Sequence, residues 1–201
     1  MARATDTDAG RHTSDKLLLG DDVSNAVITS GYGGLRLRGW VKVSGDSLQL
    51  DPAVEGIADV FGTASQWIQV SFLDGDQASS VLLVRGETLG VVLRPLESGV
   101  LEVAAIDEGA DTESVSGKLI AGFMARQNAG TVTVDIESAG SSRSAAAHLA
   151  QGQWSFQVAV DGVAVDAQRE DSITADLVLA RFNKWLPAAE PPIVQRERQT
   201  V

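Results

Sequence analysis

The stretch QWSFQVAVDGVAVDAQ, residues 153–168, decides the fold class. A Val-Ala-Val triplet stands on each side of Asp161-Gly162, and runs rich in β-branched residues that end at a turn signal are typical of strands. Asp-Gly favours the two-residue type I′ turn, because both central residues of that turn need a positive φ. The stretch therefore predicts two antiparallel strands joined by a tight hairpin.

Similar strand signals occur over most of the chain on the N-terminal side of this hairpin. Glycine is frequent, with 20 residues, which suits a fold with many turns. Turns are expected at residues 31–34, 74–79 and 85–88. Strand-like runs lie at residues 26–43, 65–96, 99–106, 114–127 and 130–138. About nine to eleven closely spaced strands predict an all-β fold, mainly antiparallel, arranged as a sandwich or a barrel.

One short helix is expected near residues 52–61, in the stretch DPAVEGIADVFG. Asp51 can accept a hydrogen bond as the N-cap, Pro52 suits the first helical position, and Gly62 can end the helix. Apolar residues inside the stretch recur at helical spacing, so that one face can be buried.

Two segments fit more than one structure. The stretch SAAAHLAQG, residues 144–152, is compatible with a helical turn or with a strand of small residues. In residues 173–185, a helix capped by Asp171 or Ser172 competes with a strand in which Ile173 begins an alternating apolar pattern. We favour the strand for 173–185, because the surrounding sequence has strand character.

Both ends of the chain predict flexible arms around one domain. Residues 1–22 are polar and have too little apolar surface to offset the entropy of ordering. Residues 187–201 are rich in proline, which blocks helices and favours extended chain. We therefore expect an N-terminal arm (1–22), a single β-rich domain (23–186) and an extended C-terminal arm (187–201). The candidate assembly arm is formed by Pro191, Pro192, Ile193 and Val194.

Composition limits the classes of partner and of chemistry. The 201 residues carry a formal net charge of −11, which opposes nonspecific binding to nucleic acid or to anionic lipid. No cysteine is present, which excludes disulfides and thiol chemistry. No apolar run reaches the length of a membrane span, and the N-terminal residues show no signal-peptide core. The expectation is a soluble protein made in the cytoplasm without a cleaved signal.

Basic residues and a tryptophan alternate in LRLRGWVKV, residues 35–43. If this stretch is a strand, Arg36, Arg38, Trp40 and Lys42 lie on one face. Such a face can contact a neighbouring subunit, remain solvated and resist aggregation, or bind a ligand such as a glycan. We regard these four residues as a candidate interaction surface.

One short motif resembles a catalytic one. The residues Gly45-Asp46-Ser47-Leu48 resemble the nucleophile block of the GDSL esterase family, in which the serine attacks an ester carbonyl. That chemistry needs a histidine base preceded three residues earlier by an aspartate. His148 follows Ala145 at that spacing instead, so the sequence favours a β-turn at 45–47 and a structural role for His148.

No metal or phosphate motif is complete. The acidic stretches LDGDQ, residues 73–77, and DEGADTE, residues 107–113, lack the register of a calcium-binding loop. Gly117-Lys118 lacks both the earlier glycine and the following hydroxyl residue of a phosphate loop. We expect no metal and no cofactor.

These observations predict a protein that is not an enzyme and that builds assemblies. Arms without structure of their own commonly become ordered against a neighbouring copy. The leading hypothesis is a structural protein that assembles with copies of itself and with other structural subunits, most plausibly in a virus or phage particle as a tail-tube, decoration or connector component. The alternative is a monomeric β-sandwich module that binds a glycan or a protein through Arg36, Arg38, Trp40 and Lys42.

Overall fold

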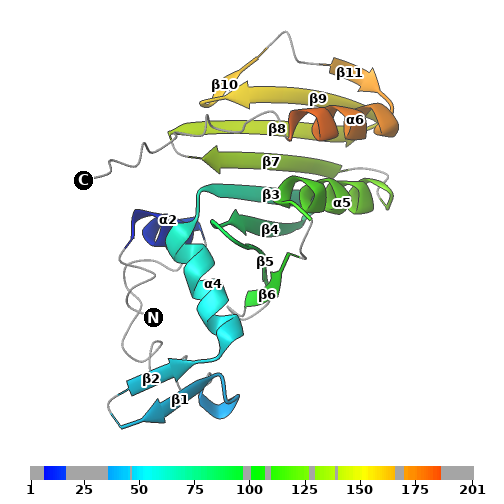
Figure 1. Ribbon diagram of the computed structural model, residues 1–201. Coiled ribbons are helices and arrows are strands. Elements are labelled where there is room, and N and C mark those ends of the chain that lie inside the picture. The colour runs from blue at the N-terminus through cyan, green and yellow to red at the C-terminus, as the bar shows by residue number, and fades with distance from the viewer. Residues whose placement is uncertain are drawn as a thin grey trace, which may run out of the picture. The chain divides into compact units, whose positions relative to one another are not determined.

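The computed structural model describes residues 7–16, 36–45, 47–96, 101–106, 110–126, 130–138, 140–165 and 170–186. Strands predominate in these residues (Figure 1). The helices are α2 (Asp8–Lys16), α4 (Pro52–Thr63), α5 (Thr112–Met124) and α6 (Ala175–Trp185). The strands are β1 (Val41–Ser44), β2 (Ser47–Leu50), β3 (Gln66–Asp74), β4 (Gln77–Arg85), β5 (Gly90–Pro95), β6 (Leu101–Ala105), β7 (Gly130–Ser138), β8 (Ser141–Ala150), β9 (Gln153–Val160), β10 (Val163–Ala164) and β11 (Glu170–Ile173).

The strands form two sheets. β1 and β2 pair only with each other among the described residues, and the other nine strands follow the order β10-β9-β8-β7-β3-β4-β5-β6, with β11 also paired to β9. This confirms the expected mainly antiparallel β fold, and the larger sheet is not closed into a barrel. The chain divides into two compact units, the first made of residues 1–67 and 82–109 and the second of 68–81 and 110–201.

The core of the first unit lies between α4 and strands β4 and β5. Its buried members are Val60, Ala64, Trp67, Leu82, Val84, Val91 and Leu93. The expected helix near 52–61 is confirmed and continues to Thr63. Asp51 caps it by accepting a hydrogen bond from the Ala53 amide at 2.9 Å, and Pro52 fills the first turn, as its sequence predicted.

Helix α2 differs from the expectation of an unstructured arm at 1–22. Residues Asp8–Lys16 are helical and contact α4. Thr13 is 1% exposed and accepts a hydrogen bond from the Trp67 indole Nε1 at 2.8 Å, while the His12 ring packs edge-on against the same indole with centroids 4.4 Å apart. The order of α2 comes from these tertiary contacts, which the polar composition of 8–16 does not reveal. The rest of 1–22 lies outside the described residues.

In the second unit, helices lie against a face of the sheet. Alternate residues of β7, β8 and β9 are buried, including Val134, Ala145 and Phe156. Helix α6 contacts both β9 and α5, and the two helices lie side by side (Figure 1). The fully buried Phe182 of α6 meets Phe156 edge to face, with ring centroids 5.1 Å apart.

The strand expected within 114–127 is wrong, because this region belongs to α5. Asp111 caps the helix through the Ser114 amide, and buried Thr112, Ser116 and Ile120 recur every four residues. The two hydroxyl residues concealed this period, because polar residues are poor markers of a core face. The Ser116 hydroxyl donates to the Thr112 carbonyl at 2.7 Å, which satisfies it inside the unit.

The strand that we favoured for 173–185 is also wrong beyond Ile173. Strand β11 ends there, and Thr174 caps α6 by accepting a hydrogen bond from the Leu177 amide. Val178 and Phe182, four residues apart, are buried, and this spacing decides the segment. The stretch 144–152, which was left open, belongs largely to β8.

The hairpin at Asp161-Gly162 is confirmed. Val160 pairs with Val163, and the two turn residues have φ values of 48° and 76°. Both angles are positive, as a type I′ turn requires. The turn expected at 31–34 lies outside the described residues.

Candidate functional site

The structural element that stands apart from the main sheet is the β1–β2 hairpin. Val41 pairs with Leu50 and Val43 pairs with Leu48 across it. Gly45 has a φ of 59° in the connecting turn, and the Ser47 hydroxyl donates to the Ser44 carbonyl at 2.7 Å. A turn is therefore present at Gly45, as expected, and Ser47 is the first residue of β2, paired with Ser44.

The hairpin has one apolar face, because side chains alternate along each strand and cross-strand partners share a face. The inner pair of this face is covered, with Val41 3% exposed and Leu50 partly buried. The outer pair is open, since Val43 is 49% exposed and Leu48 is 50% exposed. We call Val43 and Leu48 the apolar pair.

The opposite face of the hairpin is polar. It carries Lys42 opposite Gln49, and Ser44 opposite Ser47. A ribbon with one polar and one apolar face normally buries the apolar one. Here only the half of that face nearest α4 is buried.

The basic residues expected on a strand face lie in two kinds of structure. Lys42 is in β1, whereas Arg36 and Leu37 are helical and a turn follows at residues 38–39, with a hydrogen bond from the Gly39 amide to the Arg36 carbonyl at 3.0 Å. The idea of a single strand carrying Arg36, Arg38, Trp40 and Lys42 is thus wrong. Gly39 explains why the strand does not extend to residue 36, because its φ of 74° turns the chain before β1 begins.

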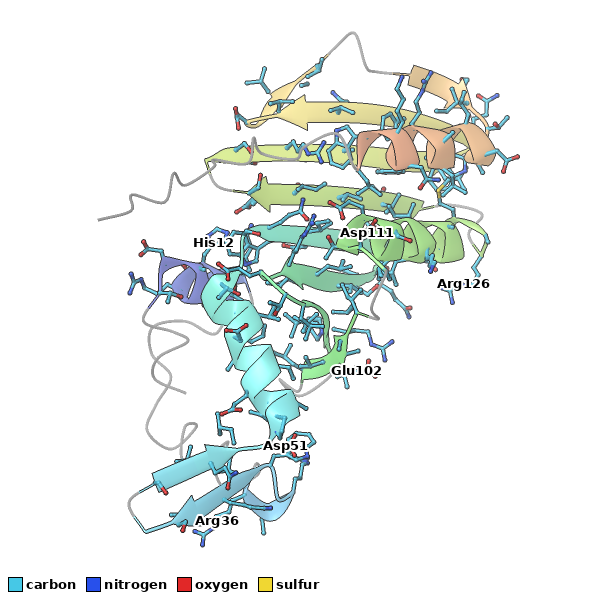
Figure 2. The ribbon with its side chains drawn as sticks, viewed as in Figure 1. His12, Arg36, Asp51, Glu102, Asp111 and Arg126 are labelled. Carbon is cyan, nitrogen blue, oxygen red and sulfur yellow. The ribbon has the colours of Figure 1, made fainter. Side chains whose placement is uncertain are left out.

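The four side chains are nonetheless exposed and near in sequence to the apolar pair. Arg36, Arg38 and Lys42 form what we call the basic cluster, and none of them pairs with a carboxylate among the described residues. The Arg38 guanidinium lies 5.6 Å from the centroid of the Trp40 ring, which is 44% exposed. Figure 2 labels Arg36 beside the hairpin and Asp51 at the point where the hairpin continues into α4.

The hairpin is tied to the start of α4. The Asp51 amide donates to the Trp40 carbonyl at 2.7 Å, which continues the β1–β2 ladder by one residue, and the Asp51 side chain caps the helix. These two contacts of Asp51 therefore join the hairpin to the first turn of α4.

The other candidate residues have structural partners. Nδ1 of His148 lies 2.8 Å from the Thr131 hydroxyl, and the pair spans β7 and β8. Asp111 serves as a helix cap, Asp74 is the last residue of β3, and Asp76 lies in the exposed turn before β4. In the part of the chain that the structure describes, no three side chains of the metal-binding types cluster together.

In the second unit, the partly buried Arg143 contacts the C-terminal end of α6. Arg143 donates from its guanidinium to the carbonyls of Trp185 and Leu186, at 2.8 and 2.6 Å, and stacks on the Trp185 ring. Burial lowers the pKa of Arg143, while the negative charge of Glu113 acts in the opposite direction. These contacts fix the C-terminal end of α6 and assign Arg143 a structural role.

The candidate assembly arm, Pro191, Pro192, Ile193 and Val194, lies outside the described residues. The apolar pair, by contrast, is a surface that the sequence reasoning missed. Its signal was present, since Val41 and Val43 before the turn are mirrored by Leu48 and Leu50 after it. The strand was expected to extend back to residue 35, and only its basic side was considered as a candidate surface.

Comparisons with known proteins add no assignment. The sequence matches no protein-family model, and no curated protein matches it either. Of the helices in the described residues, none combines the length and the apolar character needed to cross a membrane.

Proposed function

We propose that this chain is a non-enzymatic structural protein that assembles with copies of itself, and with other structural subunits, through the β1–β2 hairpin. The contacting surface is centred on the apolar pair, Val43 and Leu48. That the two terminal arms also contribute to assembly stays a prediction from the sequence.

The observation that carries the proposal is the half-exposed apolar face of an isolated two-stranded sheet. Two paired strands are marginally stable in water and gain stability when a further surface covers their apolar face. Val43 and Leu48 lie directly opposite each other and are about half exposed. Burying both would remove apolar area from water, which stabilises a complex by roughly 25 cal/mol per Å² before the costs of association.

A comparison of two hairpins provides the test. Val43→Ser/Leu48→Ser removes the apolar pair, and Val160→Ser/Val163→Ser makes the same kind of change at the β9–β10 hairpin, where the valines are 47% and 70% exposed. Sedimentation equilibrium should show concentration-dependent association of the wild-type protein. We expect the first variant to associate at least tenfold more weakly and the second to behave like the wild type, with circular dichroism unchanged in both.

Two results would contradict the proposal. One is a wild-type protein that stays monomeric up to hundreds of micromolar. The other is a Val43→Ser/Leu48→Ser variant that retains its fold and associates with unchanged affinity.

The more specific part of the proposal is that the protein belongs to a virus or phage particle. It is supported by architectural analogy, because many parts of such particles are strand-rich subunits that interlock with their neighbours, and analogy of fold has limited weight for function. Electron microscopy of the concentrated protein should show rings, tubes or shells. Discrete dimers with no larger assembly at any concentration would restrict the function to a dimeric protein.

The alternative function is a glycan- or protein-binding module, and the exposed Trp40 ring beside Arg38 is the observation that favours it. Aromatic rings with a free face stack on sugars and on other planar groups. In that case Trp40→Ala should abolish ligand binding by a monomeric protein on a glycan array. Binding retained by Trp40→Ala would eliminate this alternative.

A further inference from the structure

The nine-stranded sheet ends at β6, and this end is built differently from the opposite one. β6 pairs with β5 and with no second strand among the described residues, in one continuous register without a bulge. At the other end, β9 is lined by the two-residue β10 and by the four-residue β11, whose register shifts between Glu170 and Ile173. Very short strands and bulges keep a sheet edge from pairing with another chain, and the β6 edge has neither.

β6 also lacks the side chains that discourage pairing. Its sequence is LEVAA, with no proline and no lysine. Its one charged residue, Glu102, forms an ion pair with Arg94 of β5. Val103 is 37% exposed, although its cross-strand partner Leu93 is fully buried. Since charges and prolines are what normally protect an edge, β6 is an edge that can accept another strand.

The backbone of β6 presents a defined set of hydrogen-bonding groups. Just past its end, the Ile106 amide donates to the Gly90 carbonyl at 2.9 Å, so these two residues form a hydrogen-bonded pair of the β5–β6 ladder. Along an antiparallel strand, such pairs alternate with pairs whose amides and carbonyls point away from the partner strand. Glu102 and Ala104 therefore direct their backbone groups toward β5. The outward groups belong to Leu101, Val103 and Ala105.

These outward groups match those of a second β6 that runs antiparallel about a two-fold axis at Val103. In that register Val103 faces Val103 of the second copy, and Leu101 faces Ala105. Each of these is a hydrogen-bonded pair, so every outward amide and carbonyl of the strand has a partner. Glu102 faces the small, uncharged Ala104, so the two carboxylates are not directly opposed. The strand is thus complementary to itself in one register.

We propose that two copies of the chain join through their β6 strands, antiparallel and centred on Val103, into one continuous sheet with two-fold symmetry. Val91 and Leu93 are fully buried on one face of β5. Their partners Ala105 and Val103 lie on the same face of β6, so the pairing extends this apolar face across the axis. The inference goes beyond the proposed function, since β6 is a different surface from the β1–β2 hairpin. With both contacts, a chain can build assemblies larger than a dimer.

Opposite charges at position 103 test this register. Val103→Lys sets two ammonium groups, and Val103→Glu two carboxylates, directly opposite each other across the axis. The matched control is Ala104→Lys, which adds the same charge as Val103→Lys but sets it opposite Glu102 of the second copy. All are made in the Val43→Ser/Leu48→Ser background, so that association through the hairpin does not contribute. Sedimentation velocity measures each protein, and the equimolar mixture of the two position-103 variants, at concentrations up to about 1 mM.

We expect the Val43→Ser/Leu48→Ser background to form a dimer that is weaker than the wild-type association, because two five-residue strands make a small contact. Val103→Lys and Val103→Glu should each weaken this dimer at least tenfold, since like charges directly opposite each other destabilise a strand pair. Their mixture should recover the dimer, and Ala104→Lys should retain it. Circular dichroism should be unchanged, because both positions are exposed.

The outcomes separate this inference from the proposed function. A background variant that stays monomeric overturns the inference, whatever the wild type does. Equal weakening by Val103→Lys and Ala104→Lys, or a mixture that remains dissociated, overturns the two-fold register. If a synthetic peptide of residues 187–201 slows amide exchange in 101–105 and no dimer forms, the edge accepts the C-terminal arm and the inference is wrong. If the wild type forms only the dimer of the background variant, with equal affinity, the β6 contact stands and the hairpin contact fails.

Discussion

Gly130 stands at a place where a side chain has no room. Its φ is 153°, and an added Cβ would lie 2.7 Å from the Leu73 carbonyl oxygen and 3.2 Å from Cζ of Phe123. The first of these neighbours is backbone, which cannot move aside without disturbing β3. Overpacking of this kind costs about 1–3 kcal/mol.

The Gly130→Ala variant should therefore unfold at a melting temperature several degrees lower than the wild type, as measured by differential scanning calorimetry. Gly122→Ala is the matched control, because Gly122 is exposed within α5 and an added Cβ there meets nothing within 4 Å. Alanine is the better helix former by roughly 0.5–1 kcal/mol, so the control should be slightly more stable than the wild type. Equal effects of the two substitutions would contradict the account.

Arg143 holds the end of α6 by its guanidinium fork. Arg143→Ala removes charge-assisted hydrogen bonds to two carbonyls, and we expect a loss of about 1.5–3 kcal/mol in the free energy of unfolding by urea. Arg143→Lys should fall between Arg143→Ala and the wild type, because one ammonium group cannot reproduce the planar fork.

Arg94→Ala is the control for Arg143, since Arg94 pairs with Glu102 at an exposed site where both side chains are about half accessible. Exposed ion pairs contribute about 0–1 kcal/mol. If Arg94→Ala were as destabilising as Arg143→Ala, the stabilising role assigned to the α6 contact would be wrong.

At the scale of elements, α5 shows what the sequence could and could not reveal. Strand runs with regular alternation, such as β7, and turns with a defined dipeptide, such as Asp161-Gly162, were predictable because local chemistry decides them. Helix α5 was missed because Thr112 and Ser116 occupy its buried face, and α6 because its N-terminal half also alternates. The N-caps are Asp111 in α5 and Thr174 in α6, and neither was predicted, since the caps considered for 173–185 were Asp171 and Ser172.

Removal of the α5 cap tests the contribution of Asp111 to the helix. The Asp111 side chain accepts a hydrogen bond from the Ser114 amide, so Asp111→Ala should cost about 1 kcal/mol of stability in urea unfolding. Asp111→Ser keeps an acceptor and should lose only a few tenths. An Asp111→Ala variant as stable as the wild type would show that tertiary packing alone places the start of α5.

In the β1–β2 hairpin, too, local sequence predicted one feature of the candidate site and missed others. Its turn was predictable from Gly45 and Ser47, but the strand that was expected to begin at Leu35 starts at Val41 because of the turn at Gly39. Which half of an apolar face stays exposed depends on tertiary contacts. No pattern in residues 41–50 distinguishes the covered Val41 from the open Val43.

At the scale of the whole molecule, the sequence predicted the antiparallel β class but neither the extent of the nine-stranded sheet nor the number of helices. Strand order depends on pairing between segments distant in the chain, such as β3 with β7, and single-residue patterns contain little of that information. Helix α2 within residues 1–22 was not expected for a similar reason, because it contacts Trp67, which is distant in sequence.

The central claim is that the apolar pair becomes covered when copies meet. Hydrogen–deuterium exchange of the peptide containing residues 41–50, measured at low and at high protein concentration, tests it most directly. We predict slower exchange of these amides as the concentration rises, and no such change in Val43→Ser/Leu48→Ser. Exchange at 41–50 that is identical at all concentrations, in a sample shown by sedimentation to be associated, would contradict the claim.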